Sequence, residues 1–131
     1  MNSTVKPVRS AIESAQRTIA IELQAVAALQ QRIDDQFAKA VALLAAVEGR
    51  VIVSGMGKSG HIGSKIAATL ASTGTPAQFV HPAEACHGDM GMITRSDAAL
   101  LMSNSGTTSE ITALLPLLKR LGIPIVAMTG S

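Results

Sequence analysis

The stretch RVIVSGMGKSGHIG, residues 50–63, decides the fold class of this chain. An apolar run followed by four glycines is typical of a buried strand, a tight turn and a helix start. Three further apolar runs bounded by Gly, Ser or Pro follow: AQFVHP (77–82), AALLMSNSG (98–106) and IPIVAMTGS (123–131). Helices are expected between them at 60–72 and 107–121, and HPAEACHGDMGMI (81–93) is expected to be loop or short helix. Strands alternating with helices predict an α/β fold with a doubly wound parallel sheet.

Composition and charge narrow the class of protein. The chain has 131 residues, 47% of them hydrophobic, and only two aromatic residues, which suits one core of aliphatic side chains. A net charge of +2 from 11 basic and 9 acidic residues is too small and dispersed for a nucleic-acid partner. No apolar stretch is long enough for a membrane span. A lone cysteine, Cys86, and the lack of an apolar leader predict a cytoplasmic protein.

The N-terminal region, residues 1–48, is expected to be helical and distinct from the α/β core at 49–131. Residues 8–48 contain no Gly or Pro, and their apolar residues recur at intervals of three and four. Such a length predicts either two helices that bend near Asp34 and Asp35 or one long helix packed on a partner chain. The second alternative predicts a homo-oligomer, whereas helices folded over their own sheet would need no partner.

The glycines after the first strand match two phosphate-binding patterns poorly. Gly55, Gly57 and Gly60 satisfy the bare dinucleotide fingerprint, but no acid follows the second strand until Glu84, so a NAD-binding module has little support. A Walker A loop is excluded because its first glycine would fall on Ile52. What remains is a turn that carries one cation, Lys58, and one hydroxyl, Ser59, or else a purely structural turn.

The loop SNSGTTSE, residues 103–110, favours a phosphate site. It contains five hydroxyl side chains in one turn, whereas capping a helix requires only one. Hydroxyls, a glycine and the free N–H groups of a helix start suit a phosphate monoester without many basic residues. This loop therefore shifts the interpretation from a structural turn to a sugar-phosphate site.

Four blocks carry a resemblance to a known family: SGMGKSGHIGSKIA (54–67), LASTGTPAQFVHPAEACHGDMGMI (70–93), SNSGTTSEI (103–111) and LLKRLGIPIVAMTG (117–130). They resemble the sugar isomerase (SIS) domain, more narrowly the D-arabinose-5-phosphate isomerase family. The resemblance implies a flavodoxin-like sheet and interconversion of D-ribulose 5-phosphate and D-arabinose 5-phosphate, the entry to Kdo and lipopolysaccharide biosynthesis. It also implies a cytoplasmic homotetramer that requires no cofactor.

The resemblance also assigns roles by position. It implies that the substrate phosphate binds Ser103, Ser105 and Thr108, together with Ser59. It implies catalytic roles for Lys58 and Glu110, and contact with the substrate for Gly74, Thr75 and His87. It also implies that His81 is a metal-binding position. Isomerisation through an enediolate needs a base near the proton and positive charge near the developing oxyanion, which Glu110 and Lys58 offer. Without the resemblance, a first-turn acid and a solvated amine are the simpler interpretations of these two residues.

The segment from His81 to Asp89 contains two histidines, one cysteine and two acids, which are zinc ligands by type. Their spacing is not that of a zinc finger. A loop with histidines that face substrate is therefore favoured over a dedicated metal site, although zinc binding stays open. Cys86 is as compatible with an inert small residue as with a reactive thiol.

The chain departs from the family at its end. It stops at Met128–Ser131, where the resemblance implies a further helix, a fifth strand, another acid and histidine, and in longer members a pair of CBS domains. If those residues complete the catalytic site, weak or absent isomerase activity is expected while phosphate binding persists. The alternative function is a sugar-phosphate-binding SIS module without catalysis, such as a sensor. Residues 1–48 show no helix-turn-helix pattern that would make it a DNA-binding regulator.

Overall fold

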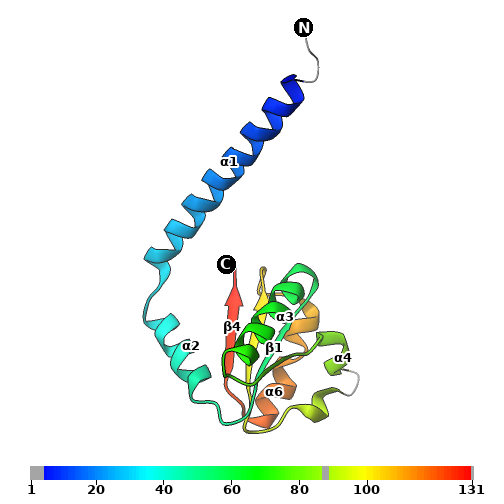
Figure 1. Ribbon diagram of the computed structural model, residues 1–131. Helices are drawn as coiled ribbons and strands as arrows, with labels where there is room; N and C mark the ends of the chain where they lie inside the picture. The colour runs from blue at the N-terminus through cyan, green and yellow to red at the C-terminus, as the bar shows by residue number, and fades with distance from the viewer. Residues whose placement is uncertain (1–4, 87–88, 131) are drawn as a thin grey trace. The chain divides into compact units, whose positions relative to one another are not determined.

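The computed structural model describes residues 5–86 and 89–130 (Figure 1). The chain divides into two compact units, one within residues 1–39 and one comprising residues 40–131. In the described part of the chain, no helix combines the length and apolar character needed to cross a membrane.

The N-terminal region is helical and breaks where one of the two alternatives placed the bend. It contains α1 (Val5–Leu29), a 3-10 turn η1 (Gln30–Arg32) and α2 (Asp35–Ala45). The Asp34 carboxylate accepts hydrogen bonds from the backbone N–H of Gln36 and Phe37 at 3.0 and 3.3 Å. These bonds satisfy N–H groups that a helix start leaves unpaired, so Asp34 starts a second helix. Every residue from 7 to 39 is exposed.

The sheet has the four strands that the apolar runs predicted: β1 (Val51–Gly55), β2 (Ala77–Phe79), β3 (Ala98–Ser103) and β4 (Ile125–Thr129). All neighbours pair in parallel, in the order β2-β1-β3-β4. Every residue of β1 and β3 is buried, as expected for the central strands of a parallel sheet covered on both faces.

Helices cover the two faces of the sheet unequally. On one face, α3 (Gly57–Ser72) packs on Val51 and Val53, and on the other face Ile52 packs beneath the remaining short helices. Those helices are α4 (Pro82–Cys86), η2 (Asp89–Met92), α5 (Ser109–Thr112) and α6 (Leu115–Leu121). The single helix predicted at 107–121 is therefore wrong. Pro116 explains the break, because its ring would clash with the carbonyl of Thr112 in a continuous helix and is tolerated only in the first turn of α6.

Asp97 fixes the amino ends of β1 and β3. Its carboxylate is buried, with Oδ1 accepting a hydrogen bond from Arg50 N at 2.7 Å and Oδ2 accepting one from Thr94 N at 2.9 Å. Asparagine has the same shape but only one acceptor oxygen. We expect Asp97→Asn to lower the free energy of unfolding by about 1–3 kcal/mol, because one of the two N–H groups loses its acceptor and faces the NH₂ group of a buried side chain. Urea titration of both proteins measures this loss, and a change no larger than that of exposed Glu48→Gln would contradict it.

Candidate functional site

The candidate site lies where the chain changes direction across the sheet. From β1 the chain enters α3 on one face and continues to β2 on one side of β1. It then returns to β3 on the other side of β1 and enters α5 on the opposite face. The loops after β1 and β3 therefore diverge at a switch point, where ligands bind in folds of this kind. The register pairs Gly55 with Met102, so Ser103 lies one residue beyond this pair.

The glycines of the first loop let α3 approach β1 closely. A Cβ at Gly60 would lie 2.6 Å from the carbonyl oxygen of Gly55, and one at Gly63 would lie 3.1 Å from Val53 Cγ1. Gly57 has φ +57°, a conformation that side chains other than glycine rarely adopt. The structural interpretation thus accounts for these glycines. It does not account for the cation and hydroxyl that follow them.

Lys58 and Ser59 lie in the first turn of α3, at the carboxyl end of β1. Lys58 is exposed and Ser59 is half-buried. The N-cap residue is Met56, whose side chain has no oxygen to accept a hydrogen bond from the first N–H groups of α3. The start of this 16-residue helix therefore presents backbone donors and a positive dipole end, with the cationic residue Lys58 in its first turn. This arrangement suits an anion.

The second loop is held by its own hydroxyls. Buried Ser103 lies with its Oγ 2.7 Å from Thr108 Oγ1 and accepts a hydrogen bond from Gly106 N at 3.0 Å. Gly106 has φ +74°, which permits the tight return of the chain. Thr107 donates from both its N–H and its hydroxyl to Ser105 Oγ, each at 3.1 Å. The loop is thus preorganised, and a phosphate would meet hydroxyls already gathered in one turn.

Glu110 lies in the first turn of α5 and is exposed. The hydroxyl of Ser109 donates a hydrogen bond to its Oε2 at 3.0 Å, which orients the carboxylate. Thr108 is the N-cap residue of α5, yet within the described chain its hydroxyl makes no capping bond and pairs with Ser103. The structure therefore brings Lys58, Ser59 and the loop from Ser103 to Glu110 to adjacent carboxyl ends of β1 and β3. Sequence reasoning missed Ser109, which no pattern separates from the other hydroxyls.

His81 follows β2 at the same edge of the sheet and is half-buried. Its Nδ1 accepts a hydrogen bond from Ala83 N at 3.2 Å. A neutral imidazole with Nδ1 as acceptor carries its proton on Nε2, so metal binding at either nitrogen would break this bond or change the tautomer. Within residues 5–86 and 89–130, no group of three or more His, Cys, Asp or Glu could hold a metal ion. The described residues do not fit a metal centre, and His87 lies outside them.

Gly74 and Thr75 lie at the other end of the sheet. They form the connection from α3 to the amino end of β2, where Gly74 has φ +104° and Thr75 N donates to Leu70 O at 2.9 Å. Within a single chain they therefore lie at the opposite end of the sheet from Lys58 and Glu110. Their contact with substrate stays a prediction.

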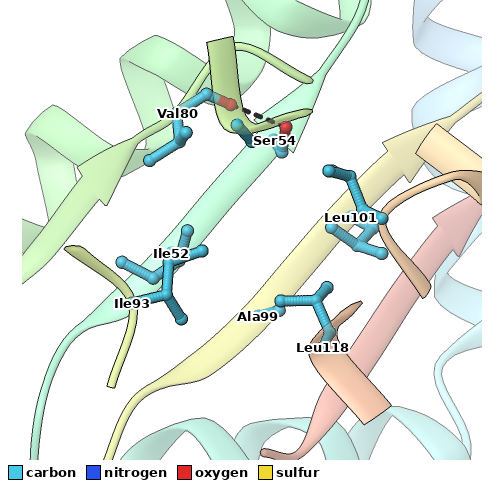
Figure 2. A pocket seen from close by; sticks show the side chains of 9 residues that line it. Ile52, Ser54, Val80, Ile93, Ala99, Leu101 and Leu118 are labelled. Carbon is cyan, nitrogen blue, oxygen red and sulfur yellow. Dashed lines mark hydrogen bonds between the residues drawn. The ribbon is translucent and has the colours of Figure 1, made fainter. Parts of the chain in front are cut away.

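A small cavity behind the site is apolar. Figure 2 shows Ile52, Ala99 and Leu101 pointing from the sheet toward the helices on its second face. The hydroxyl of Ser54, also among its lining residues, donates to the carbonyl oxygen of Val80 at 2.6 Å. That bond ties the end of β1 to the residue before His81. The cavity is therefore part of the core, and the polar groups that suit a ligand lie in the two loops.

Comparisons with known proteins identify the family of this chain. Residues 44–131 match the SIS domain family. The arabinose 5-phosphate isomerase KdsD of Pseudomonas aeruginosa is 67% identical over 92% of this chain and 37% of its own length. The arabinose 5-phosphate isomerase GutQ of Escherichia coli K12 is 51% identical, and the match covers 91% of this chain and 37% of the length of GutQ. The chain thus spans well under half of these curated relatives.

A solved structure of a protein from E. coli CFT073, in complex with arabinose 5-phosphate, has the same fold. It superimposes with a TM-score of 0.89 at 43% identity, covering 100% of this chain and 67% of the other. The family match includes both loops of the candidate site and all four strands of the sheet. This chain belongs to the SIS domain family.

Proposed function

We propose that this chain carries the phosphate-binding and proton-transfer residues of an aldose–ketose isomerase that interconverts D-ribulose 5-phosphate and D-arabinose 5-phosphate. The observation that carries the proposal is that the strand order brings an uncapped helix start with Lys58 and a hydroxyl-rich loop with Glu110 to one switch point. The names of the KdsD and GutQ relatives support the reaction, and the complex of the E. coli CFT073 protein with arabinose 5-phosphate supports the substrate.

The phosphate of the substrate occupies the two loops. Backbone N–H groups at the start of α3 and the hydroxyl of Ser59 bind it from one side, and the hydroxyls of Ser103, Ser105 and Thr108 bind it from the other. Binding exchanges the Ser103–Thr108 hydrogen bond for bonds to phosphate oxygens. The anchored phosphate then sets the distance of the sugar carbons from α5.

Glu110 acts as the base on the anchored sugar. It takes the proton from the hydroxyl-bearing carbon beside the carbonyl, which leaves an enediolate. The hydroxyl proton of that carbon passes to the former carbonyl oxygen, and Glu110 returns the carbon-bound proton to the former carbonyl carbon. Lys58, at the end of the adjacent strand, places positive charge near the oxyanion of that intermediate. The Ser109 hydroxyl holds one oxygen of Glu110 and so limits the orientations from which the other oxygen can reach the substrate. No cofactor is required, because the reaction only relocates protons within the substrate and exchanges no electrons with another molecule.

The proposal extends to the pathway, the cellular compartment and the assembly in which the reaction takes place. The product supplies the synthesis of Kdo and hence lipopolysaccharide, and the reaction takes place in the cytoplasm, where a thiol such as exposed Cys86 stays reduced. We propose a homotetramer as the assembly. The apolar side chains exposed along α1 support self-association, and neither nucleic acid nor membrane is a partner.

Proton NMR of D-arabinose 5-phosphate with this chain in D₂O tests the proposal. We expect ribulose 5-phosphate to appear, together with deuterium at the carbon beside the carbonyl, because proton abstraction exposes that position to solvent. The phosphorus resonance should broaden in the same sample if the two loops bind phosphate. Broadening of the phosphorus resonance without ribulose 5-phosphate or deuterium incorporation would contradict catalysis by this chain and identify a binding module. A phosphorus resonance that does not broaden would contradict the phosphate site itself.

A further inference from the structure

Thr107 is the one hydroxyl residue in the loop 103–110 to which the proposed function gives no role. Three of the other four are phosphate ligands in that proposal, and the fourth, Ser109, orients Glu110. Thr107 is exposed, so burial in the core does not explain a threonine at this position. Its hydrogen bonds show what its side chain does.

Thr107 directs two hydrogen bonds at a single atom. Its backbone N–H and its hydroxyl both donate to Ser105 Oγ, each at 3.1 Å. The first bond closes a turn in which a serine side chain accepts from the N–H two residues further along. The second bond requires a hydroxyl at position 107, because alanine or valine has no donor in its side chain. A hydroxyl oxygen has two lone pairs, and these two bonds occupy both of them.

Occupied lone pairs make Ser105 a hydrogen-bond donor toward a ligand. An unconstrained hydroxyl rotates and can either donate or accept. With Thr107 on both lone pairs, the Ser105 O–H takes the third direction around Oγ, and only this O–H can form a hydrogen bond to a ligand. The oxygens of a phosphate dianion are strong acceptors and need donors. The hydroxyl of Ser105 is thus matched to phosphate before phosphate arrives.

The residue between the two, Gly106, ties this pair to the core. Its N–H donates to the Oγ of buried Ser103 at 3.0 Å. Its φ of +74° turns the chain back, so that both donors of Thr107 reach Ser105. The hydroxyl of Ser105 is therefore held relative to Ser103, which is a second phosphate ligand in the proposed function.

We propose that Thr107 is a positioning residue for phosphate, which fixes the hydroxyl of Ser105 as a donor while Ser105 makes the contact. The inference rests on the proposed phosphate site and adds to it a residue that acts through another. Binding then does not have to order the Ser105 hydroxyl, and ordering side chains on binding lowers affinity. Hydrogen bonds at the surface replace bonds to water and add little net stability. Thr107 therefore affects binding and not folding.

Thr107→Val tests the role of the hydroxyl. Valine keeps the branched shape and the backbone N–H, so only the side-chain donor to Ser105 is lost. Titration with D-arabinose 5-phosphate, followed by phosphorus NMR, measures the dissociation constant. We expect this constant to rise about three- to tenfold, which corresponds to the net contribution of one hydrogen bond. Thr107→Ser restores the hydroxyl and should bind as the unmodified chain does.

Thr112→Val is the matched control. Thr112 is also exposed, and its hydroxyl donates to the carbonyl oxygen of Ser109 at 3.1 Å instead of to a phosphate ligand. The same change of side chain should therefore leave the dissociation constant unaltered. An equal loss of affinity in Thr112→Val and Thr107→Val would overturn the proposal, because the bond to Ser105 would then not be the cause.

A double-mutant cycle separates positioning from direct contact with phosphate. In Ser105→Ala the atom that Thr107 holds is missing, so adding Thr107→Val should weaken binding no further. If the second substitution caused its full loss in the Ser105→Ala background as well, Thr107 would act on phosphate by itself and the proposal would be wrong. Thr107→Ser that binds as weakly as Thr107→Val would also overturn it.

Failure of this inference differs from failure of the proposed function. If the unmodified chain does not bind D-arabinose 5-phosphate, the phosphate site is wrong and the inference is overturned with it. If the unmodified chain and Thr107→Val bind equally well, only the inference is wrong. Urea titration should give the same unfolding midpoint for both proteins, and a lower midpoint with unchanged affinity would show that Thr107 has a structural role instead. None of these results depends on turnover.

Discussion

Replacing Glu110 by glutamine is expected to lower the rate of isomerisation about 100- to 10,000-fold, the range typical of a lost general base. Glutamine keeps the length of the side chain and can still accept a hydrogen bond from Ser109, so the start of α5 should not change. What it cannot do is take the proton from the sugar. Deuterium incorporation into D-arabinose 5-phosphate, followed by proton NMR, measures this step directly.

The control for Glu110→Gln is Glu48→Gln. Glu48 is also exposed but precedes β1, so it lies at the amino end of the sheet, away from both loops. Its substitution should leave the exchange rate unchanged. Phosphorus line broadening should be the same in both variants, because neither residue is a phosphate ligand. If Glu110→Gln retained full exchange, the proposed base would be wrong even though the phosphate site would stand.

Replacing Gly60 by alanine is expected to lower the free energy of unfolding by about 1–3 kcal/mol, the usual cost of overpacking a well-packed site. The added Cβ would lie 2.6 Å from the backbone carbonyl oxygen of Gly55, and no side-chain rotation can move it away because the backbone fixes its position. This clash outweighs the higher helix propensity of alanine, which alone would stabilise the helix by about 1 kcal/mol. The start of α3 must then move away from β1.

Urea titration measures the loss in Gly60→Ala, and phosphorus NMR shows whether phosphate binding weakens with it. Gly91→Ala is the matched control. A Cβ there meets no described atom within 4 Å, and Gly91 is not among the glycines with positive φ. It should therefore leave stability close to that of the unmodified chain. Equal stability of Gly60→Ala and Gly91→Ala would mean that the close approach of α3 to β1 has no energetic consequence.

The sheet could be predicted from the sequence because its signal is local. Buried parallel strands need continuous apolar runs, and the run at 51–53 followed by glycines has no competing helical interpretation. The helix boundaries were harder to predict. The pattern at 107–121 is apolar at helical intervals throughout, and only the backbone of Pro116 decides where α6 begins. Helical periodicity describes which face is buried, not whether the helix is continuous.

The candidate site could be predicted in part. The hydroxyls of the loop from Ser103 and the pair Lys58 and Glu110 follow adjacent strands, so knowledge of the strand order suffices to bring them together. Gly74 and Thr75 carry no such signal. They precede a strand, and the topology places them at the opposite end of the sheet from the other residues. The hydrogen bond that His81 Nδ1 accepts could not be predicted either, because the tautomer of a histidine depends on local geometry that no sequence pattern encodes.

The strand order also dictates when the sheet can form during synthesis. The central strand β1 ends at Gly55, but its neighbour β3 ends only at Ser103, so one full side of β1 lacks a partner until Ser103 has been translated. Parallel pairing across such intervening segments is slow, because loop closure must precede the contacts that compensate for it. The helix α1 needs no distant residue to form and leaves the ribosome before β1. On the nascent chain this helix can therefore form before the sheet does.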